Sequence, residues 1–493
     1  MAAQTQDARN RKTTRARAAR ILKLPESAIE NDLLDFVLAR GDALLRARAG
    51  SGKTTALAVK IGYLVHDLGV PPSRIMVVTF NNAAARHIER KLSGIGIPEQ
   101  IRVRTFHALG QRIVRAHFGA SRTCVFDEKS KEGEHVARLM RDSLETVVNE
   151  KFYGWCASRM RTHYRKRREY VESIGYEALL SATNFLRARG YGLQNRWKNA
   201  WEDGPIVGNA MKTVLEYESR LKSARLLDGP SVLQAASWTL EREIERASMR
   251  PSDAHDVDWI FIDEFQDVSQ PYMRLVEAIR ELNGGTNVQG VGDENQAING
   301  FAGSEVSYLL EAEKHLENPK LLNLLKNRRS GAKIVDWGNS VMADADEDTI
   351  PAIADPDNGP GNLEFGHVSS ERDIRFIAGR LADMANSDAR STALIARRWK
   401  VGDHPLSGLK NILQKELDRR GIKTRITALS GHASKGLEYD AVMLLDDGTF
   451  PLQHPSRPIL EPLIPQSDFL REETCLKHVA GTRARQSLNV IRM

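Results

Sequence analysis

Residues 43–55 read ALLRARAGSGKTT, and this stretch decides the fold. A short apolar run enters it and a helix-compatible run, residues 54–64, leaves it, which predicts a strand, a phosphate-binding loop and a helix. Small residues let backbone N–H groups approach a triphosphate, and the N-terminus of the helix favours the anion. A glycine-rich turn that merely precedes Lys-Thr is the alternative, but the flanking strand and helix favour the nucleotide site.

Within this loop, individual residues have expected tasks. Lys53 is expected to reach the β- and γ-phosphates, and the hydroxyl of Thr54 is expected to hold Mg²⁺. The first position of the general pattern is Ala47 rather than glycine, so the match is imperfect at that residue. The residues expected to bind the nucleotide are Ala47, Arg48, Ala49, Gly50, Ser51, Gly52, Lys53, Thr54 and Thr55.

An acidic pair further along the chain is the second signal. The buried-strand pattern of residues 259–262 runs into Asp263 and Glu264. Such a pair at a strand end is typical of a magnesium-dependent NTPase, in which Asp263 would hold Mg²⁺ and Glu264 would orient and deprotonate the attacking water. Because a phosphate-binding loop precedes it, the pair favours this interpretation over two exposed acids after a strand.

Polar and aromatic residues also follow neighbouring predicted strands. Residues 74–80 read as a buried strand followed by Asn81-Asn82, and residues 101–104 read as a strand followed by Thr105-Phe106-His107. Residues at the carboxyl ends of such strands face the crevice where α/β sheets bind ligands. Ordinary loop capping is the alternative for either stretch alone.

A further predicted strand, residues 287–291, precedes two more candidates. Gln296 is a candidate sensor of the γ-phosphate, and Phe301 is either a base-stacking ring or a core residue. After about residue 321 a second α/β pattern begins. Its predicted strands are residues 392–396, 426–429, 440–445 and 488–491, with helices at 413–420 and 473–485.

Composition sets broad limits on the class of protein. The chain has 493 residues, of which 41% are hydrophobic, so it has room for two to four domains with real cores. A net charge of +7 suggests a polyanionic partner, although many basic proteins bind none. Three well-separated cysteines without a CxxC pair argue against a zinc or iron–sulfur site and a disulfide framework. Without a long apolar run, no membrane span is expected, and a cytoplasmic protein is predicted.

Two segments lie outside the α/β pattern. Residues 1–20 are polar and basic and are expected to form a disordered tail, with a weak phosphate contact as the alternative. Residues 121–225 turn helical and charged and are expected to form an accessory insertion. Within it, residues 159–170 carry six basic side chains with Tyr164 and Tyr170. This run suits single-stranded nucleic acid and a solvated helix face about equally.

In sequence order, eight short segments resemble the motifs of the UvrD/Rep/PcrA group of superfamily 1 DNA helicases. Chance agreement of eight ordered patterns is improbable. The segments are Ala47–Thr54, Thr79–Ala85, Thr105–His107, Asp263–Asp267, Gly292–Gly303, Asn327–Ser330, His432–Glu438 and Val479–Ala484. The resemblance covers about residues 22–493 apart from the helical insertion.

The resemblance implies an α/β fold of two RecA-like parallel-sheet domains with ATP between them. Residues 21–120 and 226–325 would form the first domain, residues 121–225 its helical insertion, and residues 326–493 the second domain. A large insertion called 2B usually precedes the motif that here is His432–Glu438. Because residues 424–429 pass straight to His432, no large insertion is expected in the second domain.

The resemblance also assigns expected tasks to residues. Arg329 and Arg483 would act as arginine fingers, which stabilise charge on the transferring phosphoryl group. Glu438 would contact the ribose, and Arg328 stands where the family commonly has a tyrosine that stacks on adenine, a task a guanidinium can also perform. The single-strand path would be lined by Phe80, Asn82, Thr105, Phe106, His107, Phe301 and His432.

The predicted function is an ATP-dependent 3′→5′ DNA helicase or translocase that uses ATP and Mg²⁺ and binds single-stranded DNA, with the polarity resting on the resemblance alone. The alternative is a DNA-sensing NTPase subunit of a defence or repair complex, in which hydrolysis gates a protein partner. A plain P-loop kinase is a weaker third interpretation, because a kinase needs no arginine-bearing second α/β domain.

Overall fold

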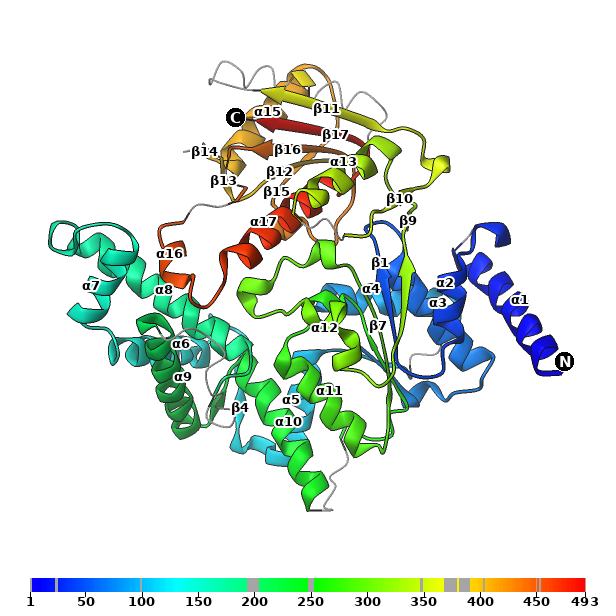
Figure 1. Ribbon diagram of the computed structural model, residues 1–493, viewed down its shortest axis with the longest axis horizontal. Coiled ribbons are helices and arrows are strands. Elements are labelled where there is room, and N and C mark those ends of the chain that lie inside the picture. Colours follow the sequence, from blue (N-terminus) through cyan, green and yellow to red (C-terminus); the bar gives the residue numbers. More distant parts are fainter. Residues whose placement is uncertain are drawn as a thin grey trace.

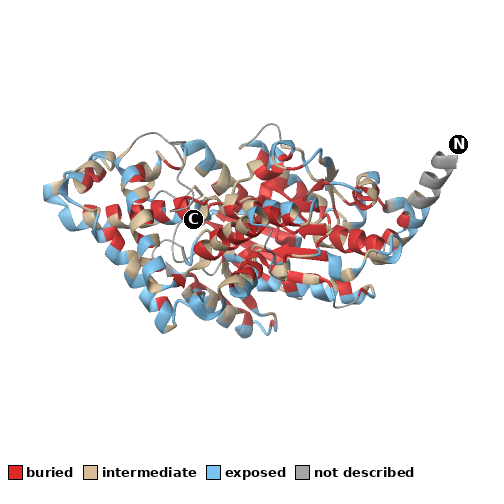
Figure 2. Ribbon diagram, turned by 90° about the horizontal axis from the view of Figure 1, so that it is seen from below, coloured by how far each residue is buried: buried red, intermediate tan, exposed pale blue. Residues whose placement is uncertain are grey.

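The computed structural model shows two α/β domains joined side by side, with a helical body beside the first (Figure 1). It describes residues 2–22, 25–97, 100–192, 204–246, 252–345, 349–367, 379–380, 391–401, 404–448, 450–451 and 454–492. Buried residues concentrate in the two sheets and the helices packed on them (Figure 2). No helix in these ranges combines the length and apolar character that a membrane crossing requires.

The first domain is built on a parallel six-stranded sheet of order β3-β2-β6-β7-β1-β8. Its strands are β1 (Ala43–Ala47), β2 (Ile75–Thr79), β3 (Arg102–Thr105), β6 (Trp259–Ile262), β7 (Asn287–Gly292) and β8 (Lys320–Leu324). Strand β6 is apolar throughout and β2 is apolar up to Thr79, because both faces of the sheet are covered by helices.

Helices cover the two faces of this sheet separately. One apolar cluster joins α2 (Asn31–Leu38), α3 (Lys53–His66) and α4 (Asn82–Gly94) to the sheet. The cluster on the other face joins α5 (Phe106–Phe118), α10 (Gly229–Glu245), α11 (Gln270–Leu282) and the short α12 (Ser307–Leu310).

The predicted insertion contains helices with a core of their own. They are α6 (Lys131–Glu145), α7 (Glu150–Arg159), α8 (Arg168–Ala188) and α9 (Pro205–Ala224). At the base of this body the two-residue strands β4 (Thr123–Cys124) and β5 (Leu226–Leu227) pair, where the chain leaves and re-enters the first domain. Residues 193–203 of the predicted insertion lie outside the described residues.

The second domain has a parallel five-stranded sheet of order β11-β17-β16-β12-β15. These strands are β11 (Asn362–His367), β12 (Thr392–Ala396), β15 (Ile426–Ser430), β16 (Tyr439–Asp446) and β17 (Ala484–Arg492). One face packs against α15 (Leu406–Arg419), and the other packs against α13 (Ala332–Ala343) and α17 (Gln466–Gly481). The remaining short elements are β9 (Lys326–Asn327), β10 (Ile353–Ala354), β13 (Lys400–Val401), β14 (His404–Pro405) and α16 (Arg457–Leu460).

The connection from α15 to β15 is short and tied down. The side chain of Gln414 accepts a hydrogen bond from the Ile426 backbone at 3.0 Å and donates one to the Thr424 carbonyl at 3.2 Å. Residues 420–425 therefore close directly onto β15. The second domain has no large insertion at this point, and the predicted fold of two RecA-like α/β domains is confirmed.

Two predicted elements were wrong. Residues 2–22 form helix α1 rather than a disordered tail. Alanine and arginine are good helix formers, and Arg15 holds the helix in place by donating to the Ile29 carbonyl at 2.6 Å. The predicted helix 473–485 ends at Gly481, where a Cβ would lie 2.1 Å from the Trp337 ring, and Arg483 sits in the turn before β17.

Candidate nucleotide and nucleic-acid site

A cavity of about 1180 Å³ lies between the two domains at the carboxyl ends of their strands. This is where open parallel sheets bind ligands. Most of the residues predicted for the nucleotide line it, together with several from the second domain. Its lining includes Arg48, Gly50, Gly52, Lys53, Thr54, Thr55, Asp263, Glu264, Gln296, Arg328, Arg329, Glu438 and Arg483.

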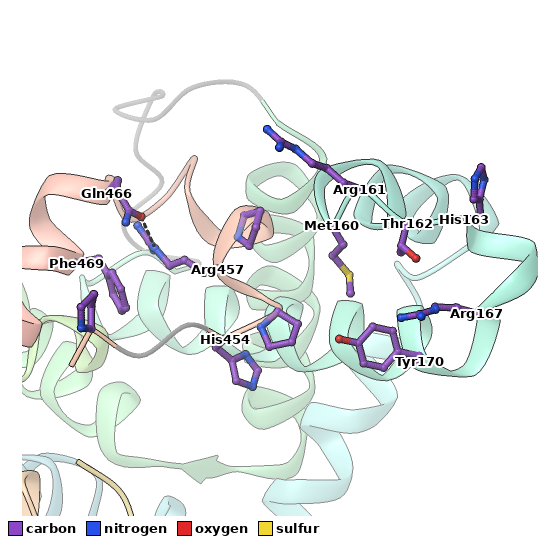
Figure 3. Close-up of a pocket in the computed structure, with 13 residues that line it drawn as sticks. Met160, Arg161, Thr162, His163, Arg167, Tyr170, His454, Arg457, Gln466 and Phe469 are labelled. Carbon is purple, nitrogen blue, oxygen red and sulfur yellow. Dashed lines mark hydrogen bonds between the residues drawn. The ribbon is translucent and has the colours of Figure 1, made fainter. Parts of the chain in front are cut away.

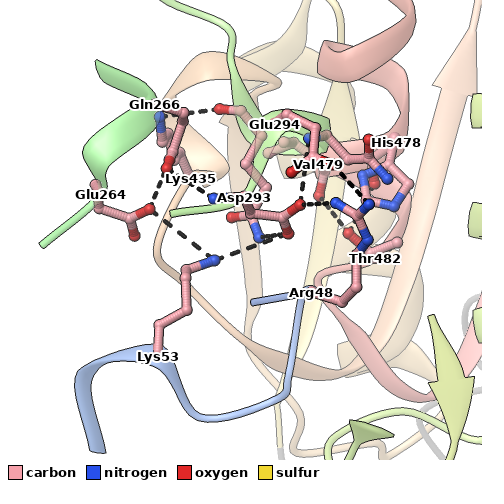
Figure 4. Close-up of polar contacts among 12 residues, drawn as sticks. Arg48, Lys53, Glu264, Gln266, Asp293, Glu294, Lys435, His478, Val479 and Thr482 are labelled. Atoms are coloured by element: carbon pink, nitrogen blue, oxygen red, sulfur yellow. Dashed lines mark hydrogen bonds and ion pairs between the residues drawn. The ribbon is translucent and has the colours of Figure 1, made fainter. Parts of the chain in front are cut away.

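The phosphate-binding loop joins β1 to α3. Gly50 and Gly52 have φ values of +74° and +96°, which glycine adopts without strain. A Cβ at Gly50 would lie 2.5 Å from Oδ1 of Asn327, so the second domain closes directly on the loop. Lys53 Nζ lies 4.0 Å from Oε2 of Glu264 and 3.8 Å from Oδ2 of Asp293 (Figure 4).

Arg48 lies deep beneath this loop and is nearly inaccessible to solvent. Its guanidinium pairs with Asp293 at 2.9 Å and Glu294 at 2.7 Å, and its Nε donates to the Ile350 carbonyl. Arg48, which was predicted to bind the nucleotide, thus forms buried ion pairs with the protein instead. Arg48 keeps a cavity-lining position, but its hydrogen-bond donors are directed at the protein.

The acidic pair follows β6. The Thr54 hydroxyl donates to Asp263 Oδ2 at 3.1 Å. Burial and the neighbouring charge of Glu264 raise the pKa of Asp263 above its usual range. Burial opposes ionisation of Glu264 as well, but Lys53 and Lys435 hold its pKa below the usual range.

Glu264 is a strained residue at the end of β6. Its backbone is left-handed, with φ +56°, which is uncommon for a residue with a side chain. Gln266 donates to Glu264 Oε2 at 2.7 Å and accepts from the Asp293 backbone at 2.9 Å (Figure 4). This amide therefore fixes the carboxylate at the edge of the cavity.

The second domain contributes two arginines. Arg329 pairs with Glu438 at 3.1 Å and donates to the Thr482 carbonyl at 2.8 Å. Arg483 is 2% exposed and donates to the Val479 carbonyl at 2.8 Å. Burial and the positive charge of Arg329 lower the pKa of Arg483 to about 9. The second guanidinium is therefore held rigidly without a carboxylate in its hydrogen-bond set.

Gln296 and Arg328 are both already engaged. Gln296 is 3% exposed and donates to Asp293 Oδ2 at 2.6 Å. The backbone N–H of Arg328 donates to the Gly50 carbonyl at 3.0 Å, and its guanidinium pairs with Glu30 at the start of α2. Arg328 therefore lies beside the phosphate-binding loop.

The predicted strand path is only partly exposed. Phe301 is 56% exposed and meets the His432 ring edge-on, with ring centroids 5.4 Å apart, so this pair joins the two domains. Asn82 is exposed at the start of α4 and Phe80 is half-buried. The Phe301–His432 pair is called the ring platform below.

Two of the predicted DNA contacts do not face solvent. Phe106 is 1% exposed and packs on Phe80 and Tyr272, with centroids 5.4 and 4.6 Å away, so its ring is a core residue. The Thr105 hydroxyl caps α5 by accepting from the Ala108 N–H at 3.1 Å. The half-buried His107 lies beside them, and burial lowers its pKa. The expectation that Phe106 contacts DNA was wrong, because the first turn of α5 points it into the sheet.

Sequence reasoning gave no task to Asp293, Glu294 and Lys435, although they lie within the segments Gly292–Gly303 and His432–Glu438. Asp293 and Glu294 follow β7, so their position at a strand carboxyl end was the signal that could have identified them. Lys435 pairs with Asp267 from the other domain, and no local sequence pattern predicts this contact.

Comparison with known proteins agrees with this geometry. A family model described as UvrD/REP helicase N-terminal domain matches residues 31–317, and one described as UvrD-like helicase C-terminal domain matches residues 405–493. The chain is 25% identical to ATP-dependent DNA helicase PcrA of Leuconostoc citreum, over 70% of this chain and 43% of that protein.

Two further relatives have similar statistics. The PcrA protein of Bacillus subtilis (strain 168) is 24% identical over 78% of this chain and 48% of its own length. ATP-dependent DNA helicase Rep of Buchnera aphidicola subsp. Acyrthosiphon pisum is 24% identical over 62% of this chain and 43% of its own length. The chain thus spans about half the length of these relatives or less. Since the N-terminal model alone covers more than half of the chain, the protein belongs to the UvrD/REP helicase family.

Proposed function

We propose that the protein couples Mg²⁺-dependent ATP hydrolysis to 3′→5′ movement along single-stranded DNA. One observation supports the hydrolysis: Lys53 and Glu264 from the first domain and Arg483 from the second line a single cavity. The polarity rests on the resemblance alone. Hydrolysis at such an interface changes how the domains fit together. The names of the relatives support ATP and DNA as substrates.

In this proposal the loop binds the phosphates. Backbone N–H groups around Gly50 and Gly52 and the ammonium of Lys53 would hold the β- and γ-phosphates. Thr55, whose hydroxyl accepts a hydrogen bond from Lys91, would close the site at the first turn of α3. Arg48 would act indirectly, by holding Asp293 beneath Lys53.

Thr54 and Asp263 fit a magnesium ion. Neighbouring oxygens around octahedral Mg²⁺ are about 2.9 Å apart, as its ligand distance of about 2.0–2.1 Å requires, and here the two oxygens are 3.1 Å apart. Among the described residues, no three His, Cys, Asp or Glu side chains gather as a metal site. One carboxylate and one hydroxyl suit an ion that also binds phosphate oxygens and water. The ion would neutralise charge on the β- and γ-phosphates.

Glu264 is proposed as the general base. Its pKa is held low, so it is ionised and able to accept the proton of the attacking water. Arg329 and Arg483 would stabilise charge on the transferring phosphoryl group. Gln296 would sense the γ-phosphate: its side-chain amide would leave Asp293 and donate a hydrogen bond to the phosphate instead.

Glu438 and Arg328 are proposed to contact the nucleoside. Glu438 accepts from Arg329 and Arg485, so a ribose hydroxyl would join an existing polar cluster. The planar guanidinium of Arg328 would stack on the base. Because a guanidinium stacks on any base, we expect weak discrimination among NTPs.

The strand would cross the ring platform and the residues that follow β2 and β3. Asn82 and His107 would contribute polar contacts, and Phe80 a partly exposed ring. Residues 121–225 would serve as the accessory domain. A role as a DNA-sensing NTPase that gates a partner is the second candidate, and the direct connection from α15 to β15 is the observation that favours keeping it.

The test is an NTPase assay with and without single-stranded DNA, single-stranded RNA and duplex. We expect hydrolysis to rise with single-stranded DNA, and binding to weaken steeply with salt. Lys53→Ala should abolish turnover, with Lys131→Ala on α6 as the matched control. Polarity would be read from translocation on strands labelled at either end. Hydrolysis that ignores every nucleic acid would overturn the proposal.

A further inference from the structure

A second cavity, of about 790 Å³, lies between the helical insertion and the second domain (Figure 3). One wall is the turn after α7 and the start of α8, and the other is formed by residues 454–458 and the first turn of α17. We call it the insertion groove. Three arginines, two histidines and two aromatic rings line it, and none of its described lining residues is acidic.

The insertion groove is built by a clamp between the two bodies. Ile459 of α16 and the following Leu463 are 0% and 2% exposed because they belong to the apolar core of the insertion. Arg159 donates to the Pro458 carbonyl at 2.8 Å and pairs with Glu461 at 2.6 Å. The two walls are therefore held together by a shared core and ion pair.

The structure separates four of the six basic side chains in residues 159–170 by their surroundings. Arg159 belongs to the clamp, and Arg168 pairs with Glu172 on its own helix at 2.8 Å. Arg161 and Arg167 instead line the groove and are exposed. Arg168 thus lies on a solvated helix face, Arg159 holds the two bodies together, and Arg161 and Arg167 line the cavity.

Rings stand on both walls of the insertion groove. Tyr170 is 42% exposed, and Figure 3 shows it beside Arg167, both pointing towards the wall that carries His454. On that wall the Arg457 guanidinium lies over the Phe469 ring at 4.5 Å from its centroid. Cations that hold phosphates beside flat groups that stack on bases are the chemistry of single-strand binding.

Helix α17 connects the groove to the ring platform. Phe469 lines the groove, and Glu472, one turn later, accepts from the Phe301 backbone N–H at 3.4 Å. The groove and the ring platform therefore both border helix α17.

We propose that the insertion groove binds single-stranded DNA as a second segment of the track that begins at the ring platform. This inference rests on the proposed function. The strand phosphates pair with Arg161 and Arg167, and a base stacks on Tyr170. The contact makes the insertion part of the strand-binding surface.

The experiment measures affinity for oligo(dT) of about 6 to about 30 nucleotides, which brackets the roughly 4–16 nucleotides that one module covers. The test variant combines Arg161→Gly with Arg167→Ala. Arg161 has φ +51°, which glycine favours, so the charge is removed without backbone strain. Tyr170→Ala is the second variant. The control, Lys131→Ala with Arg138→Ala, removes two exposed charges from α6 outside the groove.

We expect the affinity of the wild-type protein to increase with oligonucleotide length in two steps. The second increase should begin at the length at which the oligonucleotide reaches the groove. The double arginine variant should lose this second rise, and its plot of log affinity against log salt should be shallower by about 1.4 for long oligonucleotides. Tyr170→Ala should weaken the binding of long oligonucleotides roughly five- to tenfold. In the groove variants, affinity for short oligonucleotides and the stimulation of hydrolysis by them should be unchanged. The control variant should bind oligonucleotides of every length as the wild-type protein does.

Three results would overturn the inference. These are an unchanged second rise in the groove variants, an equal loss for short oligonucleotides or the control, and competition by poly-glutamate as strong as that by a long oligonucleotide. Failure of the proposed function would look different, because wild-type protein would then neither bind nor respond to oligonucleotides of any length.

Discussion

Lys435 of the second domain donates hydrogen bonds to both carboxylate oxygens of Asp267 of the first, at 2.8 and 2.6 Å. It also donates to the Gln296 carbonyl at 3.1 Å. The two side chains are 15% and 7% exposed, so the pair is largely shielded from water. Asp267 lies in the segment that carries Glu264, and Lys435 lies between His432 and Glu438. The contact therefore links the proposed hydrolytic residues to the proposed strand path.

Asp267→Asn should weaken the coupling between DNA and hydrolysis. The change leaves the Lys435 ammonium in a shielded site without its counter-charge. We expect DNA-stimulated kcat to fall roughly tenfold, with basal hydrolysis changed less. Lys435→Gln and the double variant complete a double-mutant cycle, in which kcat/KM is measured in the presence of DNA. Losses that simply add would show that the two residues act independently.

Glu264→Gln should retain ATP binding and lose turnover. The amide keeps the shape and can still accept from Gln266, but it cannot take a proton from water. A loss of about 10²–10⁴-fold in kcat is expected from removal of a general base. Nucleotide affinity measured by fluorescence should stay within a few-fold of the parent, and hydrolysis at the parental rate would reject the assignment.

Arg483→Met should separate stability from activity. Burial without a carboxylate partner makes this guanidinium costly in the nucleotide-free protein, as its lowered pKa shows. We expect a higher Tm without ATP and a large loss of kcat with little change in ATP affinity. Arg329→Met is the matched comparison and should lower Tm, because it removes the ion pair with Glu438 and the hydrogen bond to the Thr482 carbonyl and leaves Glu438 with Arg485 alone. A loss of ATP affinity with normal kcat would make Arg483 a ground-state ligand.

Glu472 should make stability depend on pH. Burial, chiefly, and the charge of Glu473 raise its pKa from 4.5 to about 7. Between these values the unfolded chain releases a proton that the folded chain keeps, so the stability contributed by Glu472 falls as pH rises, by at most about 1.4 kcal/mol per pH unit. Glu472→Gln should therefore raise Tm more at pH 8 than at pH 5. An equal shift at both values would show that Glu472 titrates normally.

The short connection after α15 should limit duplex unwinding. The resemblance to the UvrD/Rep/PcrA group implies that a 2B domain would contact duplex, and residues 420–425 leave no room for one at this point of the chain. We expect the purified protein to hydrolyse ATP and move on single strands but to unwind a long duplex poorly. A gel assay with a 3′-tailed duplex measures this, with translocation on the bare tail strand as the control. Processive unwinding by the protein alone would contradict it.

Local sequence was enough to place most of the elements. The strands at 259–262 and 392–396 agree with β6 and β12 because buried parallel strands are continuous apolar runs bounded by polar residues. The helix at 2–22 was missed because charge was read as a sign of disorder, whereas arginine and alanine favour helix. The end of α17 at Gly481 was missed although glycine is a common residue at the end of a helix.

The sequence by itself determined the chemistry of the site: a loop of small residues before Lys53 and Thr54, and an acidic pair after a buried strand. These are local patterns, because a turn, a strand and a helix start are formed by adjacent residues. Only the tertiary structure decided that Arg48 faces Asp293, that Phe106 belongs to the core, and that the insertion shares its core with α16. Those outcomes depend on which distant surfaces meet, and burial then determines which charges are paired and which rings remain exposed.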